Sequence, residues 1–373
     1  MKVLITGTHF TPAQAVIEEL KKDESVKIVY VGRKTTIEGD RSRSNESRVL
    51  PELGVKFISL TAGRFSRYIT FWSIISILKI PFGFIQSFFI LVSEKPDVVL
   101  SFGGYVGLPV VVNAWLLNIP VILHEQTLVS GISNTIAGLF ANKIAVSFDK
   151  NFEFDKKKTI YTGNPMREDV VNIIDDKVSL DIKKIVELGK RKKLPIILVT
   201  GGNQGSHIIN ETFGKNLEQF LELAVIVHQT GESKYKDFEK YSEKANEKYL
   251  VKKWIDSLDW GYLLKNTDLA ISRSGANTLI EFAYFSVPAI IIPIPFSNRN
   301  EQEKNAEYFS ELGLVQKISQ IGLTSEKLLK LVKECVLNLK LLKEKAKNAK
   351  SVVIIDASRR LALETKILGE NEY

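Results

Sequence analysis

Small, carboxylate and amide side chains recur between Ser272 and Ala306 at spacings that suit the binding of phosphate, ribose and sugar groups. Ser274-Gly275-Ala276 precedes an expected helix, and these small residues would let a phosphate approach the free N–H groups of the helix N-terminus. Glu281 lies about one turn into that helix, where a carboxylate can accept hydrogen bonds from ribose hydroxyls. Gln302 and Asn305 share a face of the next expected helix and could offer amides to a sugar. Taken alone, each is more simply explained as an ordinary surface residue.

A histidine follows the first expected strand of the chain, at residues 2–6. His9 lies on a glycine-containing loop ahead of a helix that we expect to begin with Thr11 as N-cap and Pro12 at the first helical position. An imidazole that titrates near neutrality could act there as a general base. A loop histidine with no chemical task is the equally simple alternative.

Two polar or glycine-rich segments follow later strands of the same half. Phe102-Gly-Gly-Tyr105 comes after the strand at residues 95–101, and His124-Glu125-Gln126 comes after the strand at residues 120–123. The second segment could supply acid–base or sugar-binding groups, or it could be a polar strand end.

A glycine-rich turn, Gly201 to Gly205, joins the strand at residues 194–200 to a helix in the second half. Its glycines allow backbone N–H groups to reach an oxyanion. The turn lacks the Lys-Ser/Thr pair of a P-loop and the glycine spacing of a dinucleotide-binding fold, which argues against an ATPase or a dehydrogenase.

Strands alternate with helices in both halves of the chain, which predicts an α/β protein with two doubly wound parallel sheets. The 373 residues are enough for two domains. We expect a first domain at residues 1–166, a second at residues 167–350, and a last helix within residues 351–373 that packs back on the first domain.

Composition narrows the class of protein further. Cys335 is the single cysteine, and the four histidines are scattered without metal-ligand spacing, so we expect neither a disulfide framework nor a metal site. The amino terminus begins directly with a strand and shows no signal segment, which predicts a cytoplasmic protein. The formal net charge of +8 favours phospholipid headgroups, nucleic acid or nucleotide phosphates as partners, and charge alone does not choose among them.

An apolar, aromatic segment at residues 65–93 follows a basic region and a charged loop at residues 33–48 for which we expect no helix. Lys79, Pro81 and Gly83 interrupt the segment, so it is not expected to span a bilayer. Its basic and aromatic residues suit a surface that rests on an anionic membrane, although two helices that pack on the sheet would also explain it. These residues are Arg64, Phe65, Arg67, Phe71, Trp72, Lys79 and Phe82.

The chain resembles the MurG family of bacterial N-acetylglucosaminyltransferases over nearly its whole length. The family signatures occur here in order, as His9 with Pro12, Phe102-Gly-Gly-Tyr105, His124-Glu-Gln-Thr127, Thr162-Gly-Asn-Pro-Met-Arg167, Gly201-Gly-Asn-Gln-Gly205, His228-Gln-Thr-Gly231, Ile255-Asp256, Arg273-Ser-Gly-Ala-Asn-Thr278-Leu-Ile-Glu281 and Gln302-Glu-Lys-Asn305. The chain departs from the family at Thr6-Gly7-Thr8, where glycines are fewer, at Thr127 in place of asparagine, and at Asn203 in place of serine.

The resemblance implies a GT-B fold, with two Rossmann-like domains facing across a cleft, and an inverting, metal-independent transfer without cofactor. UDP-N-acetylglucosamine would be the donor, bound by the second domain, and the 4-hydroxyl of the muramyl sugar of undecaprenyl-linked lipid I would be the acceptor, bound by the first. This step of peptidoglycan synthesis implies a peripheral protein on the cytoplasmic face of the cell membrane, with no nucleic-acid partner.

The same resemblance assigns roles to residues. His9 is the first candidate for general base, with Glu125 or His124 as the second. Arg167 would face the diphosphate and Ile255 the uracil. The full set of expected substrate contacts is Gly7, Thr8, Tyr105, Thr127, Arg167, Asn203, Ile255, Arg273, Ala276, Asn277, Thr278, Glu281, Gln302 and Asn305. Two alternatives remain: a UDP-sugar transferase acting on a different lipid, and a non-catalytic subunit that binds a nucleotide sugar.

Overall fold

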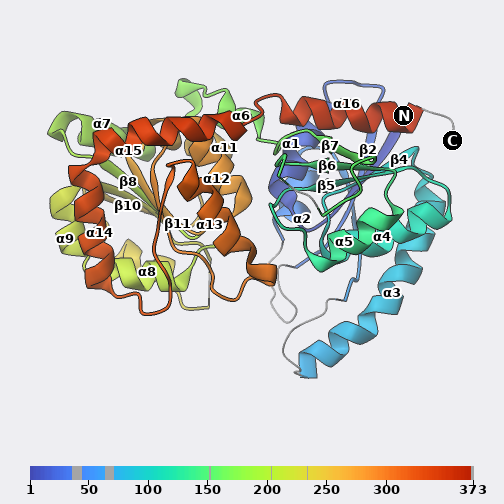
Figure 1. Ribbon diagram of the computed structural model, residues 1–373, viewed down its shortest axis with the longest axis horizontal. Coiled ribbons are helices and arrows are strands. Elements are labelled where there is room, and N and C mark those ends of the chain that lie inside the picture. The colour runs from blue at the N-terminus through green and yellow to red at the C-terminus, as the bar shows by residue number, and fades with distance from the viewer. Residues whose placement is uncertain (36–43, 64–70, 151–152, 203, 233, 371–373) are drawn as a thin grey trace. The chain divides into compact units, whose positions relative to one another are not determined.

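The structure is a computed structural model that describes the chain except residues 36–43, 64–70, 151–152, 203, 233 and 371–373. The chain forms two compact units (Figure 1). The first unit comprises Met1–Arg167 and Ile354–Tyr373, and the second comprises Glu168–Val353. The sequence-based boundaries at 166/167 and 350/351 lie one and three residues from these positions.

The first unit is built on a parallel sheet, as the alternation of strands and helices predicts. Within the described residues the sheet has seven strands in the order β3-β2-β1-β4-β5-β6-β7. The strands are β1 (Lys2–Thr6), β2 (Lys27–Gly32), β3 (Lys56–Ser59), β4 (Val98–Ser101), β5 (Val121–Glu125), β6 (Lys143–Val146) and β7 (Thr159–Tyr161). The helices are α1 (Phe10–Leu20), α2 (Asn45–Glu52), α3 (Phe71–Glu94), α4 (Gly104–Leu116), α5 (Ile132–Phe140) and α16 (Ala357–Glu370).

Both faces of this sheet are buried, which explains why its strands are apolar runs rather than alternating patterns. On β1, Val3 and Ile5 pack into one core together with α1 and α16, whereas Leu4 packs into the other core beneath α4. The last helix, α16, therefore lies against α1 although about 340 residues separate them in sequence. An ion pair between Lys366 and Asp23 joins the same two segments.

The second unit repeats the architecture. Its described strands form a six-stranded parallel sheet in the order β10-β9-β8-β11-β12-β13. They are β8 (Ile196–Thr200), β9 (Val225–Gln229), β10 (Tyr249–Lys252), β11 (Leu269–Ser272), β12 (Ala289–Ile291) and β13 (Val315–Lys317). The helices are α6 (Glu168–Val171), η1 (Asp175–Lys177), α7 (Leu180–Lys192), α8 (His207–Gly214), α9 (Leu217–Leu223), α10 (Asp237–Ser242), α11 (Ser257–Asn266), α12 (Ala276–Phe285), η2 (Asn298–Asn300), α13 (Glu301–Glu311), α14 (Ser325–Leu337), α15 (Leu339–Ala346) and η3 (Lys347–Val352).

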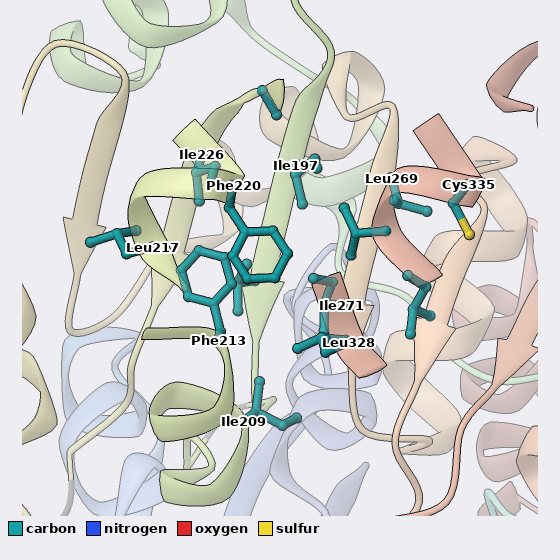
Figure 2. Packing of buried hydrophobic residues seen from close by; sticks show 14 of the residues in the cluster. Ile197, Ile209, Phe213, Leu217, Phe220, Ile226, Leu269, Ile271, Leu328 and Cys335 are labelled. Carbon is teal, nitrogen blue, oxygen red and sulfur yellow. The ribbon is translucent and has the colours of Figure 1, made fainter. Parts of the chain in front are cut away.

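One core of the second unit fixes α8 on the sheet (Figure 2). Phe213 of α8 and Phe220 of α9 stack with ring centroids 4.7 Å apart, over Ile197 and Ile226 of adjacent strands. Burial of two phenylalanines contributes roughly 3 to 6 kcal/mol. This packing holds the start of α8 at the carboxyl end of β8.

Three sequence-based expectations are wrong in detail. Helix α1 begins at Phe10 with His9 as N-cap, so Thr11 lies inside the helix. Part of the expected loop at residues 33–48 is helix α2, which is capped by Ser44, whose side chain accepts a hydrogen bond from the Ser47 N–H at 3.3 Å. The described part of the apolar segment, from Phe71 on, forms one helix, α3, that contains Pro81, rather than two helices.

Pro81 removes one backbone hydrogen bond from α3, and contacts with α4 stabilise the helix beyond the proline. Asn113 of α4 donates hydrogen bonds to the Phe84 carbonyl and the Ser87 hydroxyl of α3, each at 2.7 Å. In the part of the chain that the structure describes, no helix combines the length and the apolar character needed to cross a bilayer.

Candidate functional site

In the first unit, the loop that carries His9 packs against the turn that follows β4. The Thr8 N–H donates to the Gly103 carbonyl at 3.1 Å. Gly7 has a φ of +138°, and a Cβ there would lie 2.7 Å from the Phe102 carbonyl carbon, so this contact needs glycine. Because the strands are parallel, His9 and the segment after β5 lie at the same edge of the sheet.

The surroundings of His9 keep its imidazole neutral. Desolvation by the surrounding protein and the nearby positive charge of Arg33 lower the pKa of His9 to about 4. Both effects disfavour the imidazolium, so the imidazole is neutral at pH 7. A neutral imidazole has the free lone pair that a general base requires.

Arg33 and Glu46 belong to this site, although the sequence did not reveal them as site residues. Arg33 follows β2 and donates from Nε to Glu46 Oε1 at 3.3 Å. It also shares a hydrogen bond with Tyr105, one of the expected substrate contacts. Burial raises the pKa of Glu46. Arg33 and Glu46 lie on either side of residues 36–43, which the structure does not describe. In the sequence, the one sign that Glu46 lies on a helix is Ser44, which can act as an N-cap.

Glu125 is buried, and both of its carboxylate oxygens accept hydrogen bonds. Oε1 accepts from the Thr127 N–H at 2.9 Å and from the Thr127 hydroxyl at 2.7 Å, and Oε2 accepts from Asn134 Nδ2 at 2.8 Å. Burial raises the pKa of Glu125. The Thr127 hydroxyl also lies 2.8 Å from the Val129 carbonyl, so its one proton is shared between these two acceptors. Glu125 thus holds its own loop in place, and the Thr127 hydroxyl takes part in the hydrogen bonds that do so.

Asn134 connects Glu125 to the glycine turn after β4, a role that no sequence pattern indicated. Its Oδ1 accepts from the Gly104 N–H at 2.8 Å while its Nδ2 serves Glu125. Gly103 is required beside it, because a Cβ there would lie 2.1 Å from Asn134 Oδ1.

We expect Asn134→Ala to lower the free energy of unfolding by about 2 to 4 kcal/mol, since it removes the acceptor of the Gly104 N–H and one hydrogen bond to a buried carboxylate. Chemical denaturation would measure the loss. Thr135→Ala on the same helix removes an exposed hydrogen bond to the Gly131 carbonyl and should cost less than about 1 kcal/mol. Equal losses in the two variants would contradict the assigned role.

His124 is enclosed beside this network. Its Nε2 faces the Ser147 hydroxyl at 3.2 Å and the Gly163 carbonyl at 3.4 Å, and its ring lies against Phe102. Burial lowers its pKa to about 4. Arg167, the expected diphosphate contact, is partly exposed at the end of the first unit. His9 is the more accessible of the two histidines and remains the better candidate for a base.

In the second unit, glycines shape the turn between β8 and α8. Gly202 has a φ of +79°, and its N–H donates to the Thr200 hydroxyl at 3.0 Å. Gly205 has a φ of +75°, and a Cβ there would lie 2.0 Å from the Thr230 carbonyl oxygen. Asn203, an expected contact, lies outside the described residues. The turn directs the chain into the N-terminus of α8, where backbone N–H groups can bind an anion.

Arg273 supports this turn. Its Nη2 and Nε donate to the hydroxyl of Ser206, the N-cap of α8, at 2.8 and 3.2 Å, and Nη1 donates to the Ile292 carbonyl at 2.8 Å. Burial lowers the pKa of Arg273 to about 10, so the guanidinium stays charged at pH 7. Through these hydrogen bonds Arg273 orients the glycine turn.

Helix α12 begins at Ala276, close to the expected start at Asn277. Ala276 is buried, and Asn277 and Thr278 are partly exposed on the first turn. Glu281 is 5% exposed, and its Oε2 accepts a hydrogen bond from Trp260 Nε1 of α11 at 2.8 Å. Trp260 therefore orients the carboxylate.

Ile255 is buried just before α11, whose N-cap Asp256 accepts from the Asp259 N–H at 2.9 Å. Asp256 is held by its hydrogen bond to the backbone of the first turn of α11, and this fixes the position of Ile255, which directly precedes it. Ile255 belongs to the same unit as Glu281, and α11 and α12 pack together.

The two amides of α13 both lie beside Ser274. Gln302 Oε1 accepts from the Ile294 N–H at 3.1 Å and faces the Ser274 hydroxyl at 3.4 Å. Asn305 is fully buried and donates from Nδ2 to the Ser274 carbonyl at 3.1 Å. Asn305 thus fixes the loop after β11, and its expected contact with the sugar stays a prediction.

Among the described residues, no group of three or more His, Cys, Asp or Glu side chains has the arrangement to hold a metal ion.

Comparison with known proteins assigns both halves of the chain to one family. The model of the glycosyltransferase family 28 N-terminal domain matches residues 4–146, and that of the glycosyltransferase family 28 C-terminal domain matches residues 196–361. A protein from Bacillus cytotoxicus is 34% identical over 370 residues, 97% of each chain, and one from Halothermothrix orenii is 33% identical over 357 residues, 92% of each chain. Both are named UDP-N-acetylglucosamine--N-acetylmuramyl-(pentapeptide) pyrophosphoryl-undecaprenol N-acetylglucosamine transferase.

Solved structures share the fold. The crystal structure of Acinetobacter baumannii MurG matches with a TM-score of 0.70 at 23% identity, covering 98% of this chain and 99% of that one. The Staphylococcus aureus MnaA–UDP co-structure matches with a TM-score of 0.67 at 15% identity, covering 96% and 94%. These matches establish the GT-B arrangement of two Rossmann-like domains.

Proposed function

The chain belongs to glycosyltransferase family 28 and to its MurG group, and from this premise we propose that it transfers N-acetylglucosamine from UDP-N-acetylglucosamine to undecaprenyl-linked lipid I, forming lipid II. The observation that carries the proposal is the 34% identity to a named transferase over 97% of both chains. That agreement includes the parts of the chain that supply both the donor and the acceptor residues. The transfer assay described at the end of the Discussion tests it.

The second unit would bind the donor. The glycine turn and the N-terminus of α8 would hold the diphosphate, because free N–H groups and the helix dipole favour negative charge. Glu281 would accept hydrogen bonds from the ribose, and Gln302 would contact the sugar. Ile255 would lie against the uracil. Arg167 would add a bidentate contact to the diphosphate.

The first unit would bind the acceptor and start the reaction. The 4-hydroxyl oxygen of the muramyl sugar attacks the anomeric carbon, and His9 takes the hydroxyl proton. As the new bond forms, the bond from the anomeric carbon to the β-phosphate oxygen breaks, and UDP leaves with the electron pair. Charge that develops on UDP is stabilised by the groups that bind its diphosphate. Attack opposite the leaving group inverts the anomeric configuration.

A lipid-linked acceptor requires the protein to work at a membrane, and an apolar surface of the first unit suits that requirement. We define the α3–α5 surface as the exposed apolar side chains on α3, α4 and α5, since α4 contacts both of the other helices. Its members are Leu78, Phe82, Ile85, Phe88, Phe89, Val92, Trp115, Leu116, Ile132, Ile136 and Leu139. Exposed apolar side chains in this number on neighbouring helices suit a surface that binds something.

We propose that the α3–α5 surface rests on the cytoplasmic face of an anionic membrane. The net charge of +8 would support attraction to acidic headgroups. Of the basic and aromatic residues first expected in this role, Arg64, Phe65 and Arg67 lie outside the described residues, as do the side chains of Phe71 and Trp72. Phe82 lies on the surface and is 69% exposed.

Replacing Phe82 and Phe89 together by aspartate should lower binding to phosphatidylglycerol vesicles at least about tenfold, because insertion of each ring is favourable by roughly 1 kcal/mol or more. Vesicle co-sedimentation would measure it. Leu363→Asp, at an exposed leucine of α16, is the control and should bind vesicles like the wild type. If the double variant also bound normally, this surface would not be the membrane contact.

A further inference from the structure

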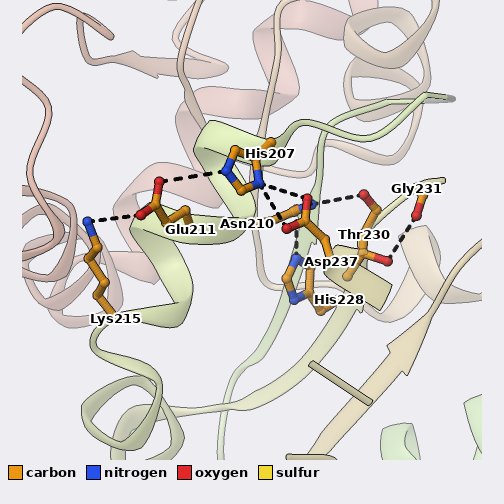
Figure 3. A network of polar contacts seen from close by, with 8 residues as sticks. All are labelled: His207, Asn210, Glu211, Lys215, His228, Thr230, Gly231 and Asp237. Carbon is orange, nitrogen blue, oxygen red and sulfur yellow. Dashed lines mark hydrogen bonds and ion pairs between the residues drawn. The ribbon is translucent and has the colours of Figure 1, made fainter. Parts of the chain in front are cut away.

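His207, the first residue of α8, is held by a buried carboxylate (Figure 3). Its Nδ1 lies 2.9 Å from Oδ1 and 3.1 Å from Oδ2 of Asp237, which is 1% exposed. The imidazole also stacks on Tyr235, with ring centroids 3.8 Å apart and an interplanar angle of 9°. A carboxylate this deeply buried needs hydrogen-bond donors, and His207 supplies one of them.

Asp237 is also connected to the end of β9 through Asn210. Asn210 Nδ2 donates to Asp237 Oδ2 at 3.0 Å and to the Thr230 carbonyl at 2.9 Å (Figure 3). Asn210 Oδ1 lies 3.0 Å from His228 Nε2, and both side chains are fully buried. The network therefore joins α8, the start of α10 and the carboxyl end of β9.

The end of β9 is the support on which the glycine turn rests. A Cβ on Gly205 would lie 2.0 Å from the Thr230 carbonyl oxygen, and a Cβ on Gly231 would lie 2.4 Å from the Gln204 carbonyl oxygen. Backbones this close leave no room for adjustment, so a shift of Thr230 or Gly231 must move the turn.

We propose that the His207–Asp237 pair is a positioning element of the donor site. The pair holds the start of α10 against α8, and Asn210 extends this hold to Thr230, beneath the turn that presents N–H groups to the donor diphosphate. The inference rests on the proposed function and deepens it. His207 affects donor binding through the glycine turn, and the hydrogen bond between its Nδ1 and Asp237 is the contact on which this effect depends.

The prediction concerns donor affinity. His207→Ala should raise the KM for UDP-N-acetylglucosamine, and the Kd for UDP, about tenfold, because a hydrogen bond to a buried carboxylate is lost. Turnover at saturating donor and the KM for lipid I should stay within about twofold of the wild type. Steady-state kinetics and titration calorimetry with UDP would measure these values on the full chain.

Two conservative variants separate positioning from general support of the fold. His207→Asn can place an amide N–H near the position of Nδ1 and should recover most of the donor affinity, whereas His207→Gln places its amide nearer Nε2 and should not. Glu211→Gln is the matched control, since Glu211 faces Nε2 at 3.9 Å and should leave the donor KM unchanged. If all four variants bind UDP like the wild type, or if His207→Asn and His207→Gln behave alike, the positioning role is overturned.

Titration calorimetry with UDP distinguishes a failure of this inference from a failure of the proposed function. A wild type that binds UDP but transfers nothing to lipid I would overturn the acceptor assignment, and the four variants would still decide the role of His207 through the Kd for UDP. A wild type that binds no UDP would overturn both.

Discussion

His9→Ala is expected to lower kcat by about 10² to 10⁴, the usual contribution of a general base, while the KM for UDP-N-acetylglucosamine stays nearly constant. The imidazole lies at the edge of the sheet in the first unit and is neutral at pH 7, with its pKa lowered to about 4. Its removal takes away the proton acceptor for the attacking hydroxyl without touching the donor residues. Steady-state transfer kinetics would measure the loss.

The pH profile gives this prediction a second test. Because desolvation and Arg33 disfavour the imidazolium, His9 stays unprotonated as the pH falls below 6.5 and becomes protonated only near pH 4. The acid limb of kcat/KM that depends on His9 should therefore lie near pH 4. Arg33→Gln should move that limb to higher pH, since it removes the positive charge that opposes protonation.

Gln14→Ala is the control for His9, because it lies on the same helix and removes only a hydrogen bond to Glu18. A His9→Ala enzyme that turns over like the Gln14→Ala enzyme would exclude His9 as the base. Glu125 would then be the next candidate, although both of its oxygens already accept hydrogen bonds within the protein.

Glu281→Ala should raise the KM for UDP-N-acetylglucosamine at least about a hundredfold, because a carboxylate that accepts two ribose hydroxyls contributes roughly 1.5 to 3 kcal/mol for each charged hydrogen bond. Trp260 Nε1 holds the carboxylate at 2.8 Å, so part of the effect reflects orientation that is established before binding. Initial-rate kinetics with varied donor would measure the change.

Glu281→Gln separates charge from shape. The glutamine oxygen can still accept from Trp260, so the fold should be preserved while the donor KM rises by an intermediate amount. Thermal unfolding of both variants shows whether Glu281→Ala also loses stability through the unpaired indole N–H. A donor KM that is unchanged in Glu281→Ala would remove the ribose assignment.

The fold was largely predictable because its strands are runs of buried aliphatic residues separated by helices. Val3 to Ile5 illustrates this, since both faces of β1 are covered. The errors fell where local signals compete with packing. Thr11-Pro12 resembles a helix start, yet the helix begins one residue earlier than Thr11. Pro81 resembles a helix end, yet α3 continues beyond it, where Asn113 donates to the Phe84 carbonyl.

Site residues could be predicted where they belong to a recognisable sequence motif. Glu281 and Gln302 could be proposed from spacing and resemblance, but Trp260 and Asn134 could not. Each of these partners is distant in sequence from the group it orients, 21 residues for Trp260 and 9 for Asn134. Only the folded chain shows that Arg273 donates a hydrogen bond to Ser206, which precedes it by 67 residues.

The most direct test of the central claim is transfer of labelled N-acetylglucosamine from its UDP donor to a lipid I analogue by the purified full chain, with EDTA present and diacylglycerol as a parallel acceptor. The account predicts labelled lipid II, undiminished by EDTA, and no glycosylated diacylglycerol. Labelled diacylglycerol without lipid II would contradict the assigned acceptor. UDP binding without transfer to either lipid would contradict the assignment of this chain as a transferase of these substrates.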